Sequence, residues 1–309
     1  MDMQPLVSVI IPTYNSEKTI KRAIDSVLTQ KFRNLEIIVV DNGSDDNTLK
    51  ILRTFQETIK VLTCNEKGAG VARNMGVKAA KGKFTAFLDS DDFWESTKLF
   101  EQLNDRYFES TTNMILGSYA TYIGSHNIVI GTTPRTKNDS DAIESLRNYG
   151  KMPMPLSTWI MHTSFFRKLG GFDRNFRVSH DLEFLIRAIN LGAILKVNRK
   201  SLAYYHLHLD SESASEYVEQ YLTAKYCVKR LSLPESCTLE SFIKQNCSWK
   251  SKYYREALSG RFFRKAIIFY TSSLYMKFTF HIVVALILAP RIFYKKLRDQ
   301  FIMVSALRN

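Results

Sequence analysis

Four short apolar segments that alternate with helical patterns constrain the fold of this 309-residue chain more than any other feature. Each segment has the composition of a strand that is buried on both faces of a sheet. The segments are Leu6–Ile11, Leu35–Val40, Ile59–Leu62 and Phe84–Leu88. Because each is followed by a helical pattern, the sequence predicts an α/β fold with a mostly parallel, doubly wound central sheet.

Three helices are predicted between these strands. Asn15 or Ser16 caps the first, and Asp45 or Asp46 begins the second. The third spans Val71–Ala80. The apolar residues at helical spacing in the first two helices are Ile20, Ala23, Ile24, Val27 and Leu28, then Leu49, Leu52 and Phe55.

The alternation becomes less regular after residue 92. We expect helices at Trp94–Phe108, Asp139–Tyr149 and Asp181–Leu191. From Glu216 to the end the pattern is helical, with breaks at Pro234 and Pro290. The remaining segments are extended or strand-like: Met114–Tyr122, Asn127–Gly131, Leu156–His162, Ile194–Val197 and Leu202–His206.

Polar side chains follow each of the first four strands. They are Thr13-Tyr14-Asn15, Asp41, the segment Lys67–Asn74, and Asp89-Ser90-Asp91-Asp92. The carboxyl ends of parallel strands meet at one edge of a sheet, so these four segments are expected to form one site.

The acidic segment at residues 89–92 places three carboxylates in four positions, which repel one another unless a positive charge is close. Mg²⁺ or Mn²⁺ carrying a substrate phosphate is the partner that we expect, since these ions prefer carboxylate oxygens. An acidic loop that caps the next helix is the alternative. Asp41 can accept an N–H from a pyrimidine, Tyr14 can stack on the base, and Arg73 can bind phosphate. The first strand–helix turn has no G-x-G-x-x-G, which argues against an NAD-binding site.

At this point the chain resembles the family 2 glycosyltransferases, which have the GT-A (nucleotide-diphospho-sugar transferase) fold. Four motifs in order carry the resemblance: Ile10-Ile11-Pro12-Thr13-Tyr14-Asn15, Val39–Asp46, Gly68 through Ala72-Arg73-Asn74, and Leu88–Asp92. It continues in Gly170–Asp173, His180–Phe184 and His208–Ser213. The motifs cover roughly the first two-thirds of the chain, and four together are far more specific than any one alone.

The resemblance implies inverting transfer of a sugar from a nucleotide donor, usually a UDP-sugar. It implies that Asp91 binds Mn²⁺ or Mg²⁺, which offsets charge on the departing diphosphate. The residues that it assigns to the donor are Pro12, Thr13, Tyr14, Glu17, Asp41, Lys67, Gly68, Arg73, Asp89, Ser90 and Asp91.

The resemblance also assigns Asp181 as the catalytic base, which takes the proton of the acceptor hydroxyl. Members of the family commonly have Glu before this base, whereas this chain has His180, whose role stays open. His208 aligns with a histidine that reaches the metal or the β-phosphate; an ordinary strand-end histidine is the alternative. We place His180, Asp92 and Trp159 on the acceptor side, although Asp92 also suits a loop-holding role and Trp159 a core position.

Most of the chain's net charge of +13 lies in its last segment. Residues 244–309 contain 13 Lys and Arg but only Glu256 and Asp299 as acids. The most apolar part, Phe278–Ala289, is shorter than the roughly 20 residues that span a bilayer. We therefore expect basic, aromatic helices that lie on an anionic membrane surface; a solvated basic face of a helical subdomain is the alternative. No nucleic-acid-binding module is recognisable, so we expect no nucleic-acid partner.

Together these patterns predict a catalytic domain at residues 1–215 and a helical, basic region at 216–309. The expected reaction is transfer to a saccharide on a polyprenyl diphosphate lipid, at the cytoplasmic face of the cell membrane, during bacterial surface polysaccharide assembly. A sugar nucleotidyltransferase and a scaffold that binds nucleotide sugars without turnover are the alternatives. The four cysteines lack metal-ligand spacing and are expected to be reduced thiols, and the N-terminal residues do not resemble a signal peptide.

Overall fold

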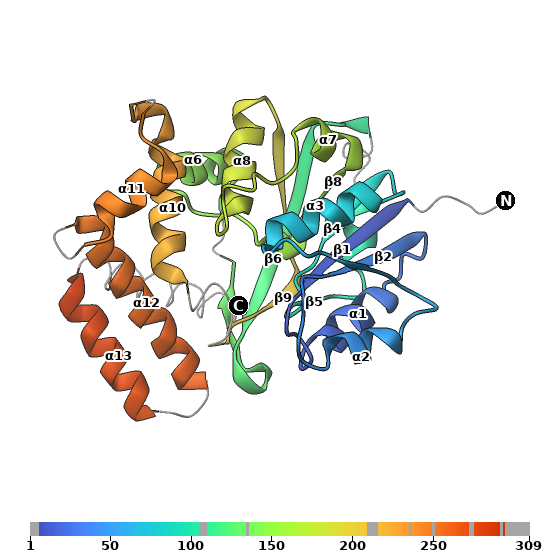
Figure 1. The fold of residues 1–309 in the computed structure, drawn as a ribbon, viewed down its shortest axis with the longest axis horizontal. Coiled ribbons are helices and arrows are strands. Elements are labelled where there is room, and N and C mark those ends of the chain that lie inside the picture. The colour runs from blue at the N-terminus through green and yellow to red at the C-terminus, as the bar shows by residue number, and fades with distance from the viewer. Residues whose placement is uncertain are drawn as a thin grey trace. The chain divides into compact units, whose positions relative to one another are not determined.

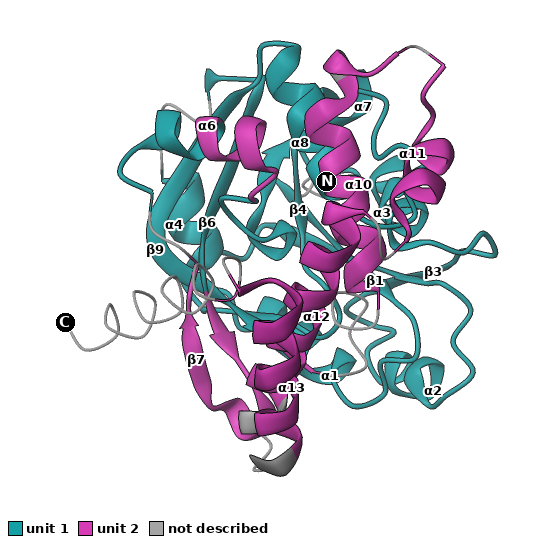
Figure 2. Cartoon of the chain, turned by 90° about the vertical axis from the view of Figure 1, so that its left-hand side faces the viewer, with its two compact units in different colours: residues 1–120, 135–143, 152–205 teal, residues 121–134, 144–151, 206–309 magenta. Residues whose placement is uncertain are grey.

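The computed structural model describes residues 6–104, 110–133, 136–208, 216–234, 236–248, 251–271, 275–290 and 293. The chain forms two compact units that alternate along the sequence (Figure 2). Unit 1 comprises residues 1–120, 135–143 and 152–205, and unit 2 comprises 121–134, 144–151 and 206–309. The predicted boundary after residue 215 adjoins a segment outside the described residues and stays a prediction.

The first four strands of unit 1 pair in parallel, as the sequence predicts (Figure 1). They are β1 (Val7–Thr13), β2 (Leu35–Asp41), β3 (Lys60–Thr63) and β4 (Phe84–Phe87). β1 lies between β2 and β4, and β3 pairs with the outer edge of β2. In this register Thr13 is opposite Asp41, so the polar ends of β1 and β2 are adjacent.

Helices cover both faces of this parallel part. Val7, Val9 and Ile11 of β1 pack in one cluster with α1 (Ile20–Leu28) and α2 (Thr48–Arg53). The intervening Ile10 faces α3 (Ala69–Ala79), whose Gly76 leaves room for the isoleucine side chain. Each fully buried Val or Ile contributes about 1.5–3 kcal/mol to folding, so alternate apolar residues fix the strand between its two helical layers.

The later strands make the sheet mixed. They are β5 (Phe93–Trp94), β6 (Met114–Ile123), β7 (Val129–Thr132), β8 (Ile160–His162) and β9 (Ile194–His206). The order in the sheet is β3-β2-β1-β4-β8-β6-β9-β5, with β7 paired to β6. β8 is antiparallel to both β4 and β6, and β5 is antiparallel to β9. Parallel pairing is thus a property of the first four strands, whose connections are the predicted helices.

Three predicted elements differ from the structure. The helix expected at Trp94–Phe108 begins only with α4 (Lys98–Leu103), because β5 pairs with β9 and the Trp94 N–H donates to Ser26 Oγ at 3.1 Å. The strand expected at Leu156–His162 begins as a 3₁₀ turn, η2 (Leu156–Thr158), before β8. The two strands expected between residues 194 and 206 are one strand, β9. Tertiary pairing overrides the local pattern at β5, whereas the 3₁₀ turn is closed by local hydrogen bonds from the N–H groups of Thr158 and Trp159 to the carbonyls of Pro155 and Leu156.

The remaining helices include α6 (Asp139–Tyr149), α7 (Thr163–Lys168) and α8 (His180–Asn190), the last of which confirms the helix expected at Asp181–Leu191. Unit 2 contains η1 (Ser125–Asn127), α10 (Tyr217–Lys229), η3 (Arg230–Ser232), α11 (Leu239–Asn246), α12 (Lys252–Thr271) and α13 (Tyr275–Leu288). α12 and α13 pack around Phe263, Ala285 and Phe293. In the part of the chain that the structure describes, no helix combines the length and hydrophobicity needed to cross a bilayer.

Candidate active site

The paired ends of β1 and β2 carry two buried oxygens that no other described group satisfies. Thr13 is 2% exposed and Asp41 is 1% exposed. Asp41 Oδ2 accepts the backbone N–H groups of Gly43 and Ser44, at 3.1 and 3.2 Å. Thr13 Oγ1 and Asp41 Oδ1 have no hydrogen-bond partner among the described residues. A buried polar atom without a partner costs about 1–3 kcal/mol, so a ligand that supplies a donor here recovers that cost.

The loop after β1 is tied to the loops after β2 and β4. Ser16 Oγ lies 2.8 Å from Ser90 Oγ, and Glu17 Oε2 accepts from both the backbone and the side chain of Asn47. Tyr14, which follows Pro12-Thr13, is 53% exposed and available for stacking. Donor contacts by Pro12, Tyr14, Glu17 and Ser90 stay predictions, and the geometry gives Glu17 a definite role in holding the loop before α2.

The turn into α3 is shaped by Asn42. Its side chain donates to the carbonyls of Cys64 and Glu66, and its Oδ1 accepts the N–H of Gly68 at 2.8 Å. Gly68 has φ of +133°, a conformation that residues with a Cβ rarely adopt. Lys67 is exposed immediately before this turn. The predicted diphosphate contacts of Lys67 and Gly68 are therefore at an ordered strand–helix junction.

The three acidic residues after β4 make three different contacts. Asp89 forms an ion pair with Arg73. The backbone carbonyl of Asp91 accepts from Arg22 Nη2 at 3.0 Å. Asp92 is 1% exposed, and its Oδ2 accepts from Ser157 Oγ at 2.5 Å. Two arginines thus reduce the mutual repulsion that the sequence implies.

The pKa of the Arg22 guanidinium depends on burial and on the charges of two of these carboxylates. Burial lowers this pKa, while the charges of Asp92 and Asp91 act in the opposite direction and raise it. No three His, Cys, Asp or Glu side chains come together as a metal-binding group in the described ranges. Mg²⁺ in nucleotide sites is commonly held by one or two carboxylates plus substrate phosphates, and Asp91 is compatible with such a site. A metal ligand at Asp91 stays a prediction.

Arg73 connects the loop after β4 to the start of α8. It is 4% exposed on α3. One terminal nitrogen, Nη2, pairs with Asp89 Oδ1, and the other, Nη1, lies 2.6 Å from His180 Nε2. Its Nε has no partner among the described residues. The guanidinium therefore holds two of the predicted site segments together, and its Nε–H is left without a partner among the described residues.

His180 begins α8 and is 4% exposed. Burial, together with the charge of Arg73, lowers its pKa to about 3, and the backbone of Arg177 acts in the opposite direction. The ring meets Phe172 edge-on, with 5.1 Å between the ring centroids. His180 is thus a neutral, enclosed side chain next to the predicted base.

Asp181 is the second residue of α8, and its Oδ1 accepts the N–H of Leu182 at 2.8 Å. Burial raises the pKa of its carboxyl group, and so does the charge of Asp89; the Leu182 hydrogen bond and the charge of Arg73 act in the opposite direction. A carboxylate with a raised pKa is a better proton acceptor than an ordinary one. This environment suits the general base that the sequence predicts.

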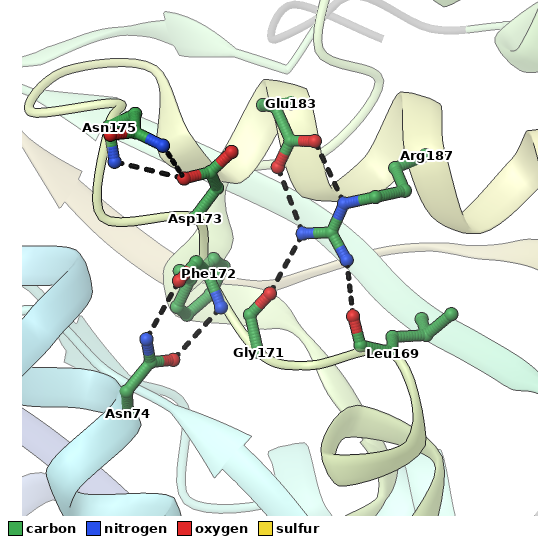
Figure 3. A network of polar contacts seen from close by, with 8 residues as sticks. All are labelled: Asn74, Leu169, Gly171, Phe172, Asp173, Asn175, Glu183 and Arg187. Atoms are coloured by element: carbon green, nitrogen blue, oxygen red, sulfur yellow. Dashed lines mark hydrogen bonds and ion pairs between the residues drawn. The ribbon is translucent and has the colours of Figure 1, made fainter.

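The loop before α8 is held on both sides by side chains (Figure 3). Asn74 of α3 donates to the carbonyl of Phe172 at 2.8 Å and accepts its N–H at 2.9 Å. Arg187 of α8 pairs with Glu183 and donates to the carbonyls of Leu169 and Gly171. Gly171 has φ of +71°, and a Cβ there would lie 2.6 Å from Asn74 Oδ1, so glycine is required. This network fixes the chain that leads to His180 and Asp181.

The other predicted acceptor residues lie in the core. Trp159 is fully buried, and its Nε1 donates to the carbonyl of Met154 at 3.3 Å. Asp92 is equally enclosed, as described above. Their contacts with an acceptor, like that of His180, stay predictions. His206 and His208 belong to unit 2, with ring centroids 5.1 Å apart, and a metal ligand at His208 stays a prediction.

Sequence reasoning missed several residues that shape the site. Asn42 and Asn74 stand inside the recognised motifs, so their position was a usable signal. Arg22 and Ser157 carry no comparable signal, because their partners Asp91 and Asp92 are 69 and 65 residues away. Arg187 was detectable only as the partner of Glu183 at i,i+4 on a helix.

Comparison with known proteins gives the same assignment. Residues 8–174 match the family described as Glycosyl transferase family 2. Over 218 residues the chain is 32% identical to the Escherichia coli UDP-Glc:alpha-D-GlcNAc-diphosphoundecaprenol beta-1,3-glucosyltransferase WfaP, covering 69% of this chain and 82% of WfaP. The E. coli enzyme WfgD, which has the same description, is 44% identical over 129 residues, covering 41% of this chain and about half (49%) of WfgD.

Solved structures show the same fold. The crystal structure of S. aureus TarS 1-349 in complex with UDP-GlcNAc matches with a TM-score of 0.60 at 19% sequence identity, covering 91% of this chain and 90% of that chain. At this identity the likeness concerns the fold alone, and it confirms the predicted fold class. The ordered strand-end motifs, their meeting in unit 1 and the match over residues 8–174 lead to one conclusion. This chain belongs to glycosyltransferase family 2, with a mixed α/β fold of the GT-A type.

Proposed function

We propose that this protein is an inverting glycosyltransferase that moves a sugar from a UDP-sugar to a saccharide on a polyprenyl diphosphate lipid, in the assembly of a bacterial surface polysaccharide such as O-antigen or capsule. The names of WfaP and WfgD describe a UDP-Glc donor and a GlcNAc-diphosphoundecaprenol acceptor, which supports this substrate class. UDP-glucose is therefore the first donor to test.

One observation carries the proposal. The unsatisfied oxygens of Thr13 and Asp41, the Arg73–Asp89 pair and the Asp181 carboxyl group all belong to unit 1. Asp41 Oδ1 suits the single ring N–H of the uracil in UDP, and the Thr13 hydroxyl can donate to a uracil carbonyl oxygen. The free Nε–H of Arg73 suits an anionic diphosphate. A raised pKa at Asp181 suits proton removal from the acceptor.

In the proposed reaction the acceptor oxygen attacks the anomeric carbon on the face opposite UDP. Asp181 accepts the hydroxyl proton as the new carbon–oxygen bond forms. The bond to the β-phosphate oxygen breaks, and UDP leaves with the bonding electrons. Asp91 would hold Mn²⁺ or Mg²⁺, which supplies charge stabilisation for the departing diphosphate.

Transfer of labelled glucose from UDP-glucose to a synthetic GlcNAc-diphospho-lipid, with Mn²⁺ or Mg²⁺ present, tests this proposal. Asp181→Asn should keep UDP affinity while turnover falls about 10²–10⁴-fold, because the general base is lost. Asp25→Asn is the control, since Asp25 is a half-exposed carboxylate paired with Lys21 on α1. Unchanged transfer by Asp181→Asn would remove Asp181 from the mechanism.

The same assay separates the alternatives. A sugar nucleotidyltransferase releases pyrophosphate from UTP and a sugar phosphate, and a scaffold binds UDP-glucose without releasing UDP. Chelation should abolish transfer, and added Mn²⁺ should restore it; full activity in chelator would exclude the proposed metal dependence.

We also propose that unit 2 attaches the enzyme to the cytoplasmic face of the membrane through α13. Its buried side faces α12, whereas Phe280, Val283 and Ile287 are 60%, 48% and 73% exposed. These three positions share one face of a helix, by their spacing of three and four residues. Residues 244–309, which include α13, contain 13 Lys and Arg against two acids, and this positive charge suits anionic headgroups.

Sedimentation with vesicles containing phosphatidylglycerol tests this attachment. The double variant Phe280→Ser/Ile287→Ser should bind about tenfold or more weakly, because two apolar side chains no longer enter the lipid. Phe100→Ser is the matched control, since Phe100 is 53% exposed on α4 in unit 1. Equal binding by all three proteins would reject α13 as the attachment site.

A further inference from the structure

We infer that His180 is a positioning residue of the catalytic centre: its neutral ring accepts a hydrogen bond from Arg73 and thereby holds this guanidinium between Asp89 and the first turn of α8. This inference deepens the proposed function, because it rests on Asp181 as the base. It replaces the acceptor contact expected for His180 with a role inside the protein.

The first step of the argument is the enclosure of the ring. His180 is 4% exposed, and Phe172 meets it edge-on. On the α3 side, a Cβ added to Gly70 would lie 3.1 Å from His180 Cγ, so the backbone of α3 approaches the ring closely. A side chain packed in this way from two directions is held in one orientation, with Nε2 directed at Arg73 Nη1.

The second step is the protonation state. Every polar hydrogen of an arginine side chain is a donor, so at 2.6 Å from Arg73 Nη1 the His180 Nε2 atom must be the acceptor. The ring proton is therefore on Nδ1, which has no hydrogen-bond partner among the described residues, and the ring is neutral. A protonated ring would place two cations in contact inside the protein, which is unfavourable.

The third step is the local charge. The groups that face one another here are Arg73 from α3, Asp89 from the loop after β4, and His180 and Asp181 on α8. The backbone of Arg177 contacts His180 as well. Arg73 is thus matched by one carboxylate and one neutral acceptor, and its charge lowers the pKa of Asp181 while that of Asp89 raises it. A glutamate at position 180 would add a negative charge beside the base and the proposed diphosphate site.

Two measurements test the inference on the full-length protein. ¹⁵N-histidine NMR reports the protonation of each ring, and His180→Gln assigns the His180 signal. The expected spectrum shows a neutral ring with the proton on Nδ1 down to pH 5. The pH dependence of kcat with UDP-glucose is the second measurement, together with UDP affinity and melting temperature for each variant.

His180→Gln should lose less than about tenfold in kcat, because the amide oxygen can still accept from Arg73. His180→Ala should lose up to about 10²-fold in kcat with little change in KM, because Arg73 is no longer held. His180→Glu should move the acidic limb of the pH profile upward by about one unit, because a like charge faces Asp181. His162→Gln is the control, since His162 is a second histidine of unit 1 that is 5% exposed.

A His180 ring that titrates near pH 6.5 would overturn the inference, whatever the activity. So would a His180→Glu variant with the wild-type pH profile and UDP affinity, or a His180→Ala variant with wild-type kcat. A wild-type enzyme that shows the expected ring signal but transfers no sugar would instead overturn the proposed function and leave the His180–Arg73 contact in place.

Discussion

The donor side and the base side of the candidate active site differ in how their buried polar atoms are satisfied. On the donor side, Thr13 Oγ1 and Asp41 Oδ1 have no partner among the described residues. On the base side, Asn74 and Arg187 make several hydrogen bonds each to the loop that leads into α8 (Figure 3).

This difference indicates two ways of preparing a site. On the donor side, two buried oxygen atoms have no hydrogen-bond partner among the described residues. A bound nucleotide can form hydrogen bonds with them, which contributes to its binding free energy. On the base side, Asn74 and Arg187 use their polar groups within the protein to hold the loop before α8, so that Asp181 is already placed before substrates bind. Arg73 Nε and His180 Nδ1, which lie next to that loop, have no partner among the described residues. Mutations on the base side should therefore lower folding stability, whereas mutations on the donor side should lower the affinity for the nucleotide donor.

The largest effect is expected for Arg187→Ala. This change leaves the charge of Glu183, 5% exposed, and two loop carbonyls without their partner. Breaking such a buried pair should lower the free energy of unfolding by about 3–5 kcal/mol, measured by urea titration. Arg174→Ala is the control, because the Arg174–Glu66 pair is exposed and worth about 0–1 kcal/mol. Equal losses in the two variants would contradict a base side fixed by buried contacts.

A smaller effect is expected from acid. The pKa of His180 is about 3 in the folded protein, below its ordinary 6.5, so the unfolded chain takes up a proton that the folded protein does not. The contribution of the neutral His180 ring to the free energy of unfolding is fully present above pH 6.5 and is lost as the pH falls toward 3. Between pH 7.5 and 5, the free energy of unfolding should fall by about 2 kcal/mol more in wild type than in His180→Gln. Parallel pH dependences would show that His180 is not held neutral.

The smallest effect is expected for Thr13→Val, which tests the donor side directly. Thr13→Val removes a hydroxyl that has no partner in the described structure, so stability should be unchanged or higher. UDP affinity should fall about fivefold to tenfold, as expected for one hydrogen bond, measured by calorimetry.

Thr85→Val is the matched control for that variant. Thr85 is a fully buried threonine on β4 whose Oγ1 lies 2.9 Å from Thr163 Oγ1. This change should lower stability by about 1 kcal/mol and leave UDP affinity unchanged. If Thr13→Val destabilises the protein as much as Thr85→Val does, the Thr13 hydroxyl already makes a stabilising hydrogen bond within the protein, and the proposed difference between the two sides is wrong.

Sequence patterns predicted the parallel half of the sheet and the order of its motifs. Residues 7–13, 35–41 and 84–87 are strands because apolar runs of this length must be buried on both faces. The later strands were harder to predict: Phe93–Trp94 lies inside a helical pattern and becomes β5 only because Tyr204 and Ala203 of β9 pair with it. Local periodicity does not contain a partner more than 100 residues away.

For the site, the sequence by itself determined which groups stand at the ends of the strands: Thr13, Asp41, the carboxylates at residues 89–92, and Asp181 near the start of a helix. Only the tertiary structure decided what each group does there. It separated Asp89, paired with Arg73, from Asp92, enclosed with Ser157, and it placed His180 against Arg73. The physical reason is that motifs follow from local chemistry, whereas burial and charge pairing depend on residues that only folding brings together.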